Sequence, residues 1–352
     1  MEQRSTPAGR DHGDLASALG VLVIGTGFIA DAHITALRAR SDAELVGVVD
    51  IDPARAATAG RTNGGVAFTT DLAEALAWPG VDACIVCTPN WTHRQIAVAV
   101  AAAGKHLLIE KPLATSVADA LAVAQVFSAA GVVLMAAHTH RFYDYARTVK
   151  AAIEEGAIGQ PVFVRLAILG GWIWPDWRAW VLDPARSGGH ALHNGVHLLD
   201  LATWWIGGQP VSVFARGRKA TAAELDIYDY LEMVVRYADG STAVCEMSRG
   251  HRTGSLNVRD VLVLGTEGTL TLPWDGDSSI VLAEQGAGLV PAAGRDGFAV
   301  QLTAWIDAIN GAAAAMSPAE AVNAVAMGVA AERSIVTGQP VELAGLFEEM
   351  MA

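Results

Sequence analysis

The sequence predicts two domains. The first is an α/β domain on a doubly wound parallel sheet, and the second is an α+β domain on a large, mainly antiparallel, open sheet. Three observations support this prediction. Short apolar runs alternate with helical patterns between residues 19 and 137, which is typical of a parallel sheet. Longer strand patterns dominate residues 211–283. The length of 352 residues suits two domains with sizeable cores.

The composition excludes several classes of protein. With 52% hydrophobic and 17% charged residues, the chain is typical of globular proteins. A net charge of −13 without a basic stripe argues against nucleic acid and anionic membranes as partners. Residues 1–17 lack the apolar core of a secretion signal and are predicted to be a disordered tail. No apolar run reaches transmembrane length, and three cysteines argue against a disulfide framework, so we expect a cytoplasmic protein.

The first expected strand, residues 19–24, ends in a glycine-rich turn followed by a helical pattern. In Gly25-x-Gly27-x-x-Ala30, the first glycine permits a tight turn and the second leaves space for a pyrophosphate, while Ala30 lets the helix pack closely on the strand. The start of the helix then offers free N–H groups and a positive dipole end to phosphates. We therefore expect a dinucleotide here, in contact with Gly25, Gly27, Phe28 and Ile29.

The second expected strand, residues 44–49, is followed by Asp50. An acid at this position accepts hydrogen bonds from ribose hydroxyls and repels a 2′-phosphate, so Asp50 favours NAD over NADP. Asp50 could instead cap the helix that begins near Pro53, although Asp52 is better placed for that role.

Two further polar segments follow strands of the same predicted sheet, 81–87 and 106–109. Ligands of such sheets bind at the carboxyl ends of the strands, so both segments should lie at the cofactor edge. The expected cofactor contacts are Thr88, Pro89, Asn90, His93, Glu110 and Lys111. The pattern changes near residue 140, so we place the dinucleotide-binding domain at 18–139 and a substrate-binding and oligomerisation domain at 140–352.

Five pieces of sequence between residue 19 and about 205 resemble the Gfo/Idh/MocA oxidoreductase family. They are the glycine turn 25–30, Thr88-Pro89-Asn90-Trp91-Thr92-His93, the segment 104–113 with Glu110-Lys111-Pro112, Arg141-Phe142, and Gly188-Gly189 with Gly195-Val196-His197-Leu198-Leu199-Asp200. The resemblance implies NAD(P)-dependent redox chemistry on sugars, inositols or related polyols. It also implies a cis Lys111–Pro112 bond, and a homodimer or homotetramer built through the open face of the second sheet.

Oxidation of a secondary alcohol needs a base for the hydroxyl proton and a group that stabilises the charge developing on oxygen. Lys111, at the end of a strand beside the expected nicotinamide, suits the second role; alternatively it is a surface lysine paired with Glu110. His197 is the candidate proton acceptor, because the unperturbed pKa of histidine lies near neutrality. The alternative is a buried histidine bonded to a backbone carbonyl.

His193 departs from the family pattern, in which many members carry Asp four residues before the base. It is expected to relay a proton, to contact substrate or to change the reaction. His190, His193 and His197 fall on one face of the helix expected over 189–206, which leaves a zinc or manganese site open as an alternative. We nevertheless expect no metal.

Substrate binding is expected in the second domain and the loop that leads into it. Four tryptophans between residues 172 and 180 could stack on a sugar or could form a loop core or an interface. The expected substrate contacts are Lys111, Arg141, Trp174, Arg178, His193 and His197.

The sequence therefore predicts an NAD-dependent dehydrogenase that acts on a secondary or anomeric hydroxyl of a sugar, anhydrosugar or inositol. One alternative is an enzyme that re-oxidises its cofactor within each turnover and cleaves or eliminates without net redox change. Another is a sensor without catalysis, against which the intact Lys111 and His197 argue.

Overall fold

The computed structural model describes residues 18–171, 179–219, 221, 223–251, 257–272, 279–283, 286–290 and 293–349. These residues form two compact units. The N-terminal unit contains the chain up to residue 113, together with 119–137 and 298–321. The C-terminal unit contains 114–118, 138–297 and the chain from 322 onward.

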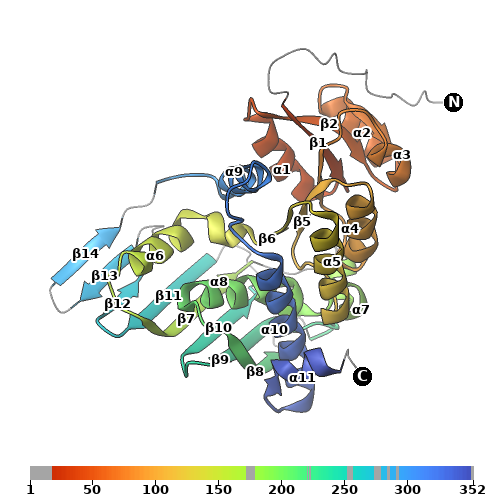
Figure 1. Ribbon diagram of the computed structural model, residues 1–352. Helices are drawn as coiled ribbons and strands as arrows, with labels where there is room; N and C mark the ends of the chain where they lie inside the picture. The colour runs from red at the N-terminus through yellow and green to blue at the C-terminus, as the bar shows by residue number, and fades with distance from the viewer. Residues whose placement is uncertain are drawn as a thin grey trace. The chain divides into compact units, whose positions relative to one another are not determined.

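The N-terminal unit is built on a parallel sheet with the strand order β3-β2-β1-β4-β5-β6. Figure 1 shows its strands β1 and β2 side by side. This order confirms the predicted doubly wound sheet, and its topological switch point lies between β1 and β4. These strands consist mainly of apolar residues that are buried in the core, and β4 is buried at every residue. The strands are β1 (Leu19–Ile24), β2 (Ala43–Val49), β3 (Ala67–Thr69), β4 (Ala83–Val86), β5 (His106–Glu110) and β6 (Leu134–Ala137).

Helices connect these strands and cover the sheet. Two of them begin at aspartates that accept backbone N–H bonds, Asp52 before α2 and Asp71 before α3, as helix capping predicts. The ring of His33 on α1 meets Phe298 of α9 edge-on, with centroids 5.1 Å apart. The helices are α1 (Phe28–Arg38), α2 (Pro53–Thr62), α3 (Leu72–Leu76), α4 (His93–Ala102), α5 (Val117–Ala130) and α9 (Gly297–Ile309), with a 3-10 turn η1 (Asn90–Thr92).

The C-terminal unit is built on a sheet whose order, within the described ranges, is β14-β13-β12-β11-β7-β10-β9-β8-β15. Neighbours pair antiparallel except β7 and β10, which confirms a mainly antiparallel sheet. The strands are β7 (Pro161–Gly170), β8 (Pro210–Arg218), β9 (Tyr230–Tyr237), β10 (Thr242–Ser248), β11 (Asn257–Gly265), β12 (Gly268–Thr271), β13 (Ser279–Ala283), β14 (Gly286–Val290) and β15 (Val341–Glu342).

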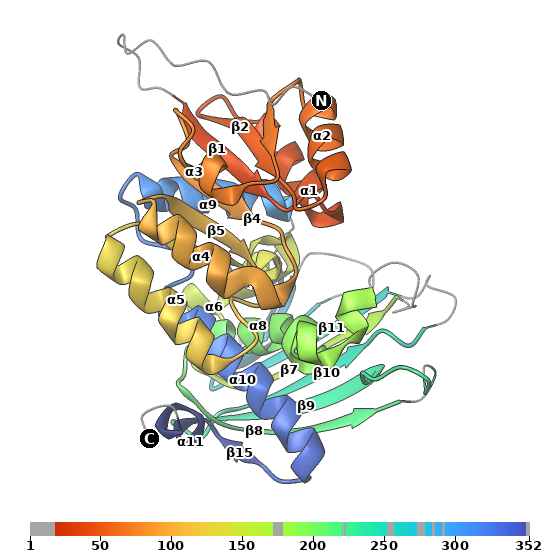
Figure 2. The ribbon, with the colours of Figure 1, turned by 90° about the vertical axis from the view of Figure 1, so that its right-hand side faces the viewer.

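One face of this sheet carries the core. Along β9, Leu231, Met233 and Val235 are fully buried, while Glu232 and Arg236 on the opposite face are exposed. Figure 2 shows α8 and α10 lying along this sheet, and the hydroxyl of Thr203 on α8 contacts Met327 on α10. The helices are α6 (Asp144–Glu154), α7 (Pro184–Ser187), α8 (Val196–Ile206), α10 (Pro318–Thr337) and α11 (Leu343–Glu348), with the turns η2 (Thr139–Phe142), η3 (Ala179–Leu182) and η4 (Ala191–Gly195).

The structure corrects one prediction about the second half of the chain. The regular helix expected over 189–206 is interrupted, because residues 191–195 form the π-helical turn η4 before α8 begins. Gly195 ends this turn where a Cβ would lie 2.9 Å from the Met233 methyl group, so the turn packs tightly on β9. No described helix is both long and apolar enough for a membrane crossing.

Candidate functional site

The glycine turn after β1 is shaped by two different requirements. Gly25 has φ +88°, and a Cβ there would lie 2.8 Å from Thr88 Cγ2 and 2.9 Å from the Cys87 carbonyl. Only glycine tolerates both that dihedral angle and that approach to β4. A Cβ at Gly27, in contrast, would meet no protein atom within 4 Å. Packing therefore does not demand glycine at 27, whereas the close approach of a pyrophosphate does.

The carboxylate of Asp50 ties the end of β2 to this turn. Its Oδ2 accepts hydrogen bonds from the Thr26 backbone N–H at 2.9 Å and from the Thr26 hydroxyl at 2.7 Å. Asp52 caps α2, where its Oδ1 accepts from Ala54 N–H at 2.8 Å, which confirms the predicted capping role; the ribose role of Asp50 stays a prediction. Asp50 and the bare backbone of Gly27 together fit the ribose and pyrophosphate of NAD.

Other predicted cofactor contacts differ widely in exposure. Phe28 is 66% exposed, but Asn90 and His93 are buried. The two ring nitrogens of His93 lie 2.8 Å from Pro112 O and 3.0 Å from Thr88 O. Burial lowers the pKa of His93, although bonds to these two carbonyls oppose the shift. His93 thus joins two strand-end segments, and its burial disfavours direct cofactor contact.

The segment after β5 carries Glu110 and Lys111, followed by a cis Lys111–Pro112 peptide bond that confirms the expectation from the family resemblance. Glu110 is buried, and its Oε1 lies 2.8 Å from His33 Nε2. Its Oε2 accepts the Lys111 backbone N–H at 3.2 Å. His33, a buried residue of α1 that the sequence analysis did not single out, is therefore part of this edge of the sheet.

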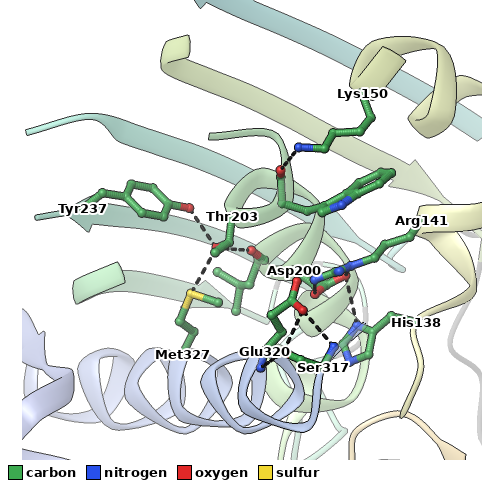
Figure 3. A network of polar contacts seen from close by, with 11 residues as sticks. His138, Arg141, Lys150, Asp200, Thr203, Tyr237, Ser317, Glu320 and Met327 are labelled. Atoms are coloured by element: carbon green, nitrogen blue, oxygen red, sulfur yellow. Dashed lines mark hydrogen bonds and ion pairs between the residues drawn. The ribbon is translucent and has the colours of Figure 1, made fainter. Parts of the chain in front are cut away.

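A second group of polar residues lies in the C-terminal unit, around the start of α8 (Figure 3). Asp200 accepts two hydrogen bonds from Arg141, 2.8 Å from Nε and 2.7 Å from Nη2, and lies 3.4 Å from His138 Nδ1. All three side chains are buried. Burial by itself would raise the pKa of Asp200, but Arg141 and His138 outweigh it and hold that pKa well below its ordinary value. Asp200 is thus an ionised carboxylate inside the unit.

His197 lies next to this group. Its ring is 4.3 Å from the ring of His140 and 6.4 Å from that of His138, centroid to centroid. His140 in turn bonds the Tyr145 hydroxyl at 2.5 Å. The candidate base is therefore surrounded by histidines from η2 and the residue before it, one of which contacts the Asp200 carboxylate. Sequence reasoning missed Asp200, although it belongs to a motif that carried the family resemblance.

The three histidines of the expected helix have separate surroundings. His190 donates from Nδ1 to Tyr228 O, whereas the ring of His193 meets Trp180 edge-on at 5.4 Å. A π-helical turn holds more residues than an α-helical one, so it breaks the regular spacing behind the metal alternative. Among the described residues, no group of three or more His, Cys, Asp or Glu side chains is arranged to hold a metal ion.

Several predicted substrate contacts cannot be placed, and one is not on the surface. Trp172, Trp174, Trp177 and Arg178 lie outside the described residues. Arg141 is 3% exposed and holds Asp200, which disfavours a substrate contact. The substrate roles of His193 and His197 stay predictions.

Glu332 was also missed by sequence reasoning. Its Oε1 accepts the Ala191 N–H at 2.6 Å, at the start of η4. A Cβ on Gly189 would lie 2.3 Å from this carboxylate, and Gly189 has φ +88°. Gly188-Gly189 therefore forms a tight turn held against α10.

Comparison with known proteins gives consistent matches. Residues 19–138 match a family model described as an oxidoreductase family with an NAD-binding Rossmann fold, and residues 146–271 match the GFO/IDH/MocA C-terminal domain. The chain is 30% identical over 336 residues to inositol 2-dehydrogenase of Rhizobium meliloti (strain 1021), covering 92% of this chain and 98% of the relative. It is 28% identical over 260 residues to 2,7-anhydro-N-acetylneuraminate hydratase of Mediterraneibacter gnavus, covering 72% and 67%. Among solved structures, GenD2 from gentamicin A biosynthesis, in complex with NAD, matches with a TM-score of 0.79 at 29% identity, covering 96% of this chain and 99% of that one.

Proposed function

Because the chain belongs to the Gfo/Idh/MocA oxidoreductase family, with its NAD-binding Rossmann domain, we propose that it oxidises a secondary or anomeric hydroxyl of a sugar, anhydrosugar or inositol. One observation carries the proposal. Lys111 follows directly on β5, at the same sheet edge as the bare backbone of Gly27 and the carboxylate of Asp50. NAD supplies the hydride acceptor when bound.

Lys111 and His197 divide the proton chemistry in this proposal. The Lys111 ammonium donates a hydrogen bond to the reacting oxygen and stabilises the negative charge that develops on it. His197 accepts the hydroxyl proton, a role suited to histidine because its unperturbed pKa lies near neutrality. The Asp200–Arg141 pair contacts His138, whose ring is 6.4 Å from that of His197, so the candidate base lies beside a fixed polar group.

A second candidate reaction is transient oxidation followed by elimination or glycoside cleavage, with no net redox change. Two observations favour it. His193 stands where many family members have Asp, and it adds an acid–base group next to Trp180. One relative bears the name of a hydratase and not that of a dehydrogenase.

The test is nicotinamide absorbance with NAD, and separately NADP, across inositols, aldoses, anhydrosugars and glycosides. We expect NADH to accumulate with one substrate, NAD to be preferred because of Asp50, and kcat to fall at least about 100-fold in Lys111→Met and His197→Ala. Release of an aglycone without NADH would support the second reaction. Full activity in Lys111→Met would refute the proposed role of this lysine.

We also propose a cytoplasmic homo-oligomer assembled through the open face of the C-terminal sheet. Leu264, Leu282 and Leu289 lie on the face opposite the core and are 36%, 46% and 63% exposed. Apolar side chains gathered on an uncovered sheet face favour contact with a second copy. Sedimentation velocity of the wild type and of Leu282→Lys distinguishes a dimer or tetramer from a monomer.

A further inference from the structure

A buried hydrogen bond between a histidine and a carboxylate joins α1 to the end of β5 in the N-terminal unit. His33 is 2% exposed and Glu110 is 8% exposed, and 2.8 Å separates His33 Nε2 from Glu110 Oε1. Burying two ionisable groups costs desolvation energy that apolar side chains of similar volume would not. A gain in folding stability therefore does not explain why these two residues are buried together.

The same carboxylate reaches the next residue of the chain. Glu110 Oε2 accepts the Lys111 backbone N–H at 3.2 Å, so one oxygen faces α1 and the other faces Lys111. Burial would raise the pKa of Glu110, but the His33 bond and the charges of His33 and Lys111 outweigh it and lower that pKa. Glu110 is thus a negative charge next to the lysine.

The residue after Lys111 is held as well. His93 of α4 bonds Pro112 O at 2.8 Å, so a buried histidine contacts each neighbour of Lys111: the side chain of Glu110 and the backbone of Pro112. The two contacts differ in kind, because His93 meets a neutral carbonyl whereas His33 meets a carboxylate. Only the His33 contact controls a charge beside Lys111.

We propose that His33 and Glu110 are positioning residues that place Lys111 and keep its ammonium protonated; this inference rests on the proposed function. The charge of Lys111 interacts with the Glu110 carboxylate, and a neighbouring negative charge favours the charged form of an ammonium. His33 holds that carboxylate in place and ionised. Among the described residues, the other titratable groups whose charges interact with Glu110 include Cys87, directly after β4, His93 on α4 and Lys111 itself.

The chain makes a direct test practical, because it contains four lysines: Lys105, Lys111, Lys150 and Lys219. Incorporation of lysine labelled with ¹³C at Cε gives each one an NMR signal whose shift reports its own titration, and Lys111→Met assigns the signal of interest. In Glu110→Gln we expect the pKa of Lys111 to fall by about one unit. His33→Phe leaves the carboxylate buried without its partner, so it should take up a proton and lower the pKa of Lys111 similarly.

Conservative and control variants separate this role from a merely structural one. His33→Gln still donates a hydrogen bond to Glu110 and should restore most of the Lys111 titration. His106→Gln alters a histidine at the amino end of the same strand, where it accepts the Val133 N–H, and should leave the titration and kcat unchanged. The signal of Lys105 serves as an internal reference. If Glu110→Gln does not fold, His33→Phe and His33→Gln carry the test.

The two proposals fail in different ways. An unchanged Lys111 pKa in Glu110→Gln or His33→Phe would overturn the positioning role, even if Lys111→Met abolishes activity. A lowered Lys111 pKa with full activity in Lys111→Met would refute only the proposed function. If both hold, the alkaline limb of the kcat profile moves to lower pH in Glu110→Gln by the same amount as the NMR titration, because the ammonium then loses its proton earlier.

Discussion

The cofactor edge of the N-terminal unit and the histidine group of the C-terminal unit are held in place by different means. At the cofactor edge, the candidate site residues are positioned by backbone turns at the ends of parallel strands. Gly25 and Gly27 shape the turn that follows β1. Around α8, buried side chains hold one another in place, and Asp200 pairs with Arg141, which lies 59 positions earlier in the chain. A site of the first kind depends on local sequence, whereas one of the second kind depends on tertiary pairing of buried charges.

The largest expected effect comes from breaking that pairing. Asp200→Asn leaves the buried Arg141 guanidinium without its carboxylate, and we expect the free energy of unfolding at pH 7 to fall by about 3–5 kcal/mol. Urea unfolding measures the change. The matched control is Asp260→Asn, which breaks an ion pair with the exposed Arg165 and should cost less than about 1 kcal/mol. Equal losses in the two variants would contradict the assignment of Asp200 as a buried anchor.

The same pairing has a pH signature. The pKa of Asp200 is lowered in the folded state, so its stabilising contribution is complete above the unfolded pKa near 4. That contribution is lost as the pH falls through the lower folded value. The difference in stability between wild type and Asp200→Asn should therefore be constant from about pH 5 to 7 and shrink below about pH 4.

Alanine substitutions at the two glycines of the turn after β1 form a matched pair of variants, and we expect their effects on stability to be smaller than that of Asp200→Asn. Gly25→Ala must adopt a positive φ and approach the Cys87 carbonyl, so we expect a loss of about 2–4 kcal/mol in the free energy of unfolding. Gly27→Ala meets no protein atom and should cost less than about 1 kcal/mol, yet should weaken NAD binding at least about tenfold. Calorimetry with NAD and urea unfolding measure both quantities. An unchanged NAD affinity in Gly27→Ala would argue against pyrophosphate binding at this turn.

The contrast between the two regions also explains what the sequence could predict. The parallel sheet followed from alternating patterns, and the cap that Asp52 forms at the start of α2 followed from helix capping preferences. Lys111 was found by its motif and strand-end position. His33 was missed because a buried histidine in an apolar helix face has the same spacing whether or not a carboxylate lies opposite. The π-helical turn, which separates His190, His193 and His197, has no local signal in the sequence.

Glu332 tests whether every buried carboxylate near α8 behaves like Asp200. Burial raises the pKa of Glu332 to about 7, although the Ala191 N–H bond opposes the shift. A raised folded pKa has the opposite sign to that of Asp200, because stability then falls as the pH rises from about 4.5 to about 7. We expect the wild type to lose about 3 kcal/mol over that interval through this group, and Glu332→Gln, which can still accept from Ala191, to lack the decline. Urea unfolding at pH 5 and pH 8 measures it. A decline that persists in Glu332→Gln would assign the pH dependence to another group and leave Glu332 ionised, as Asp200 is.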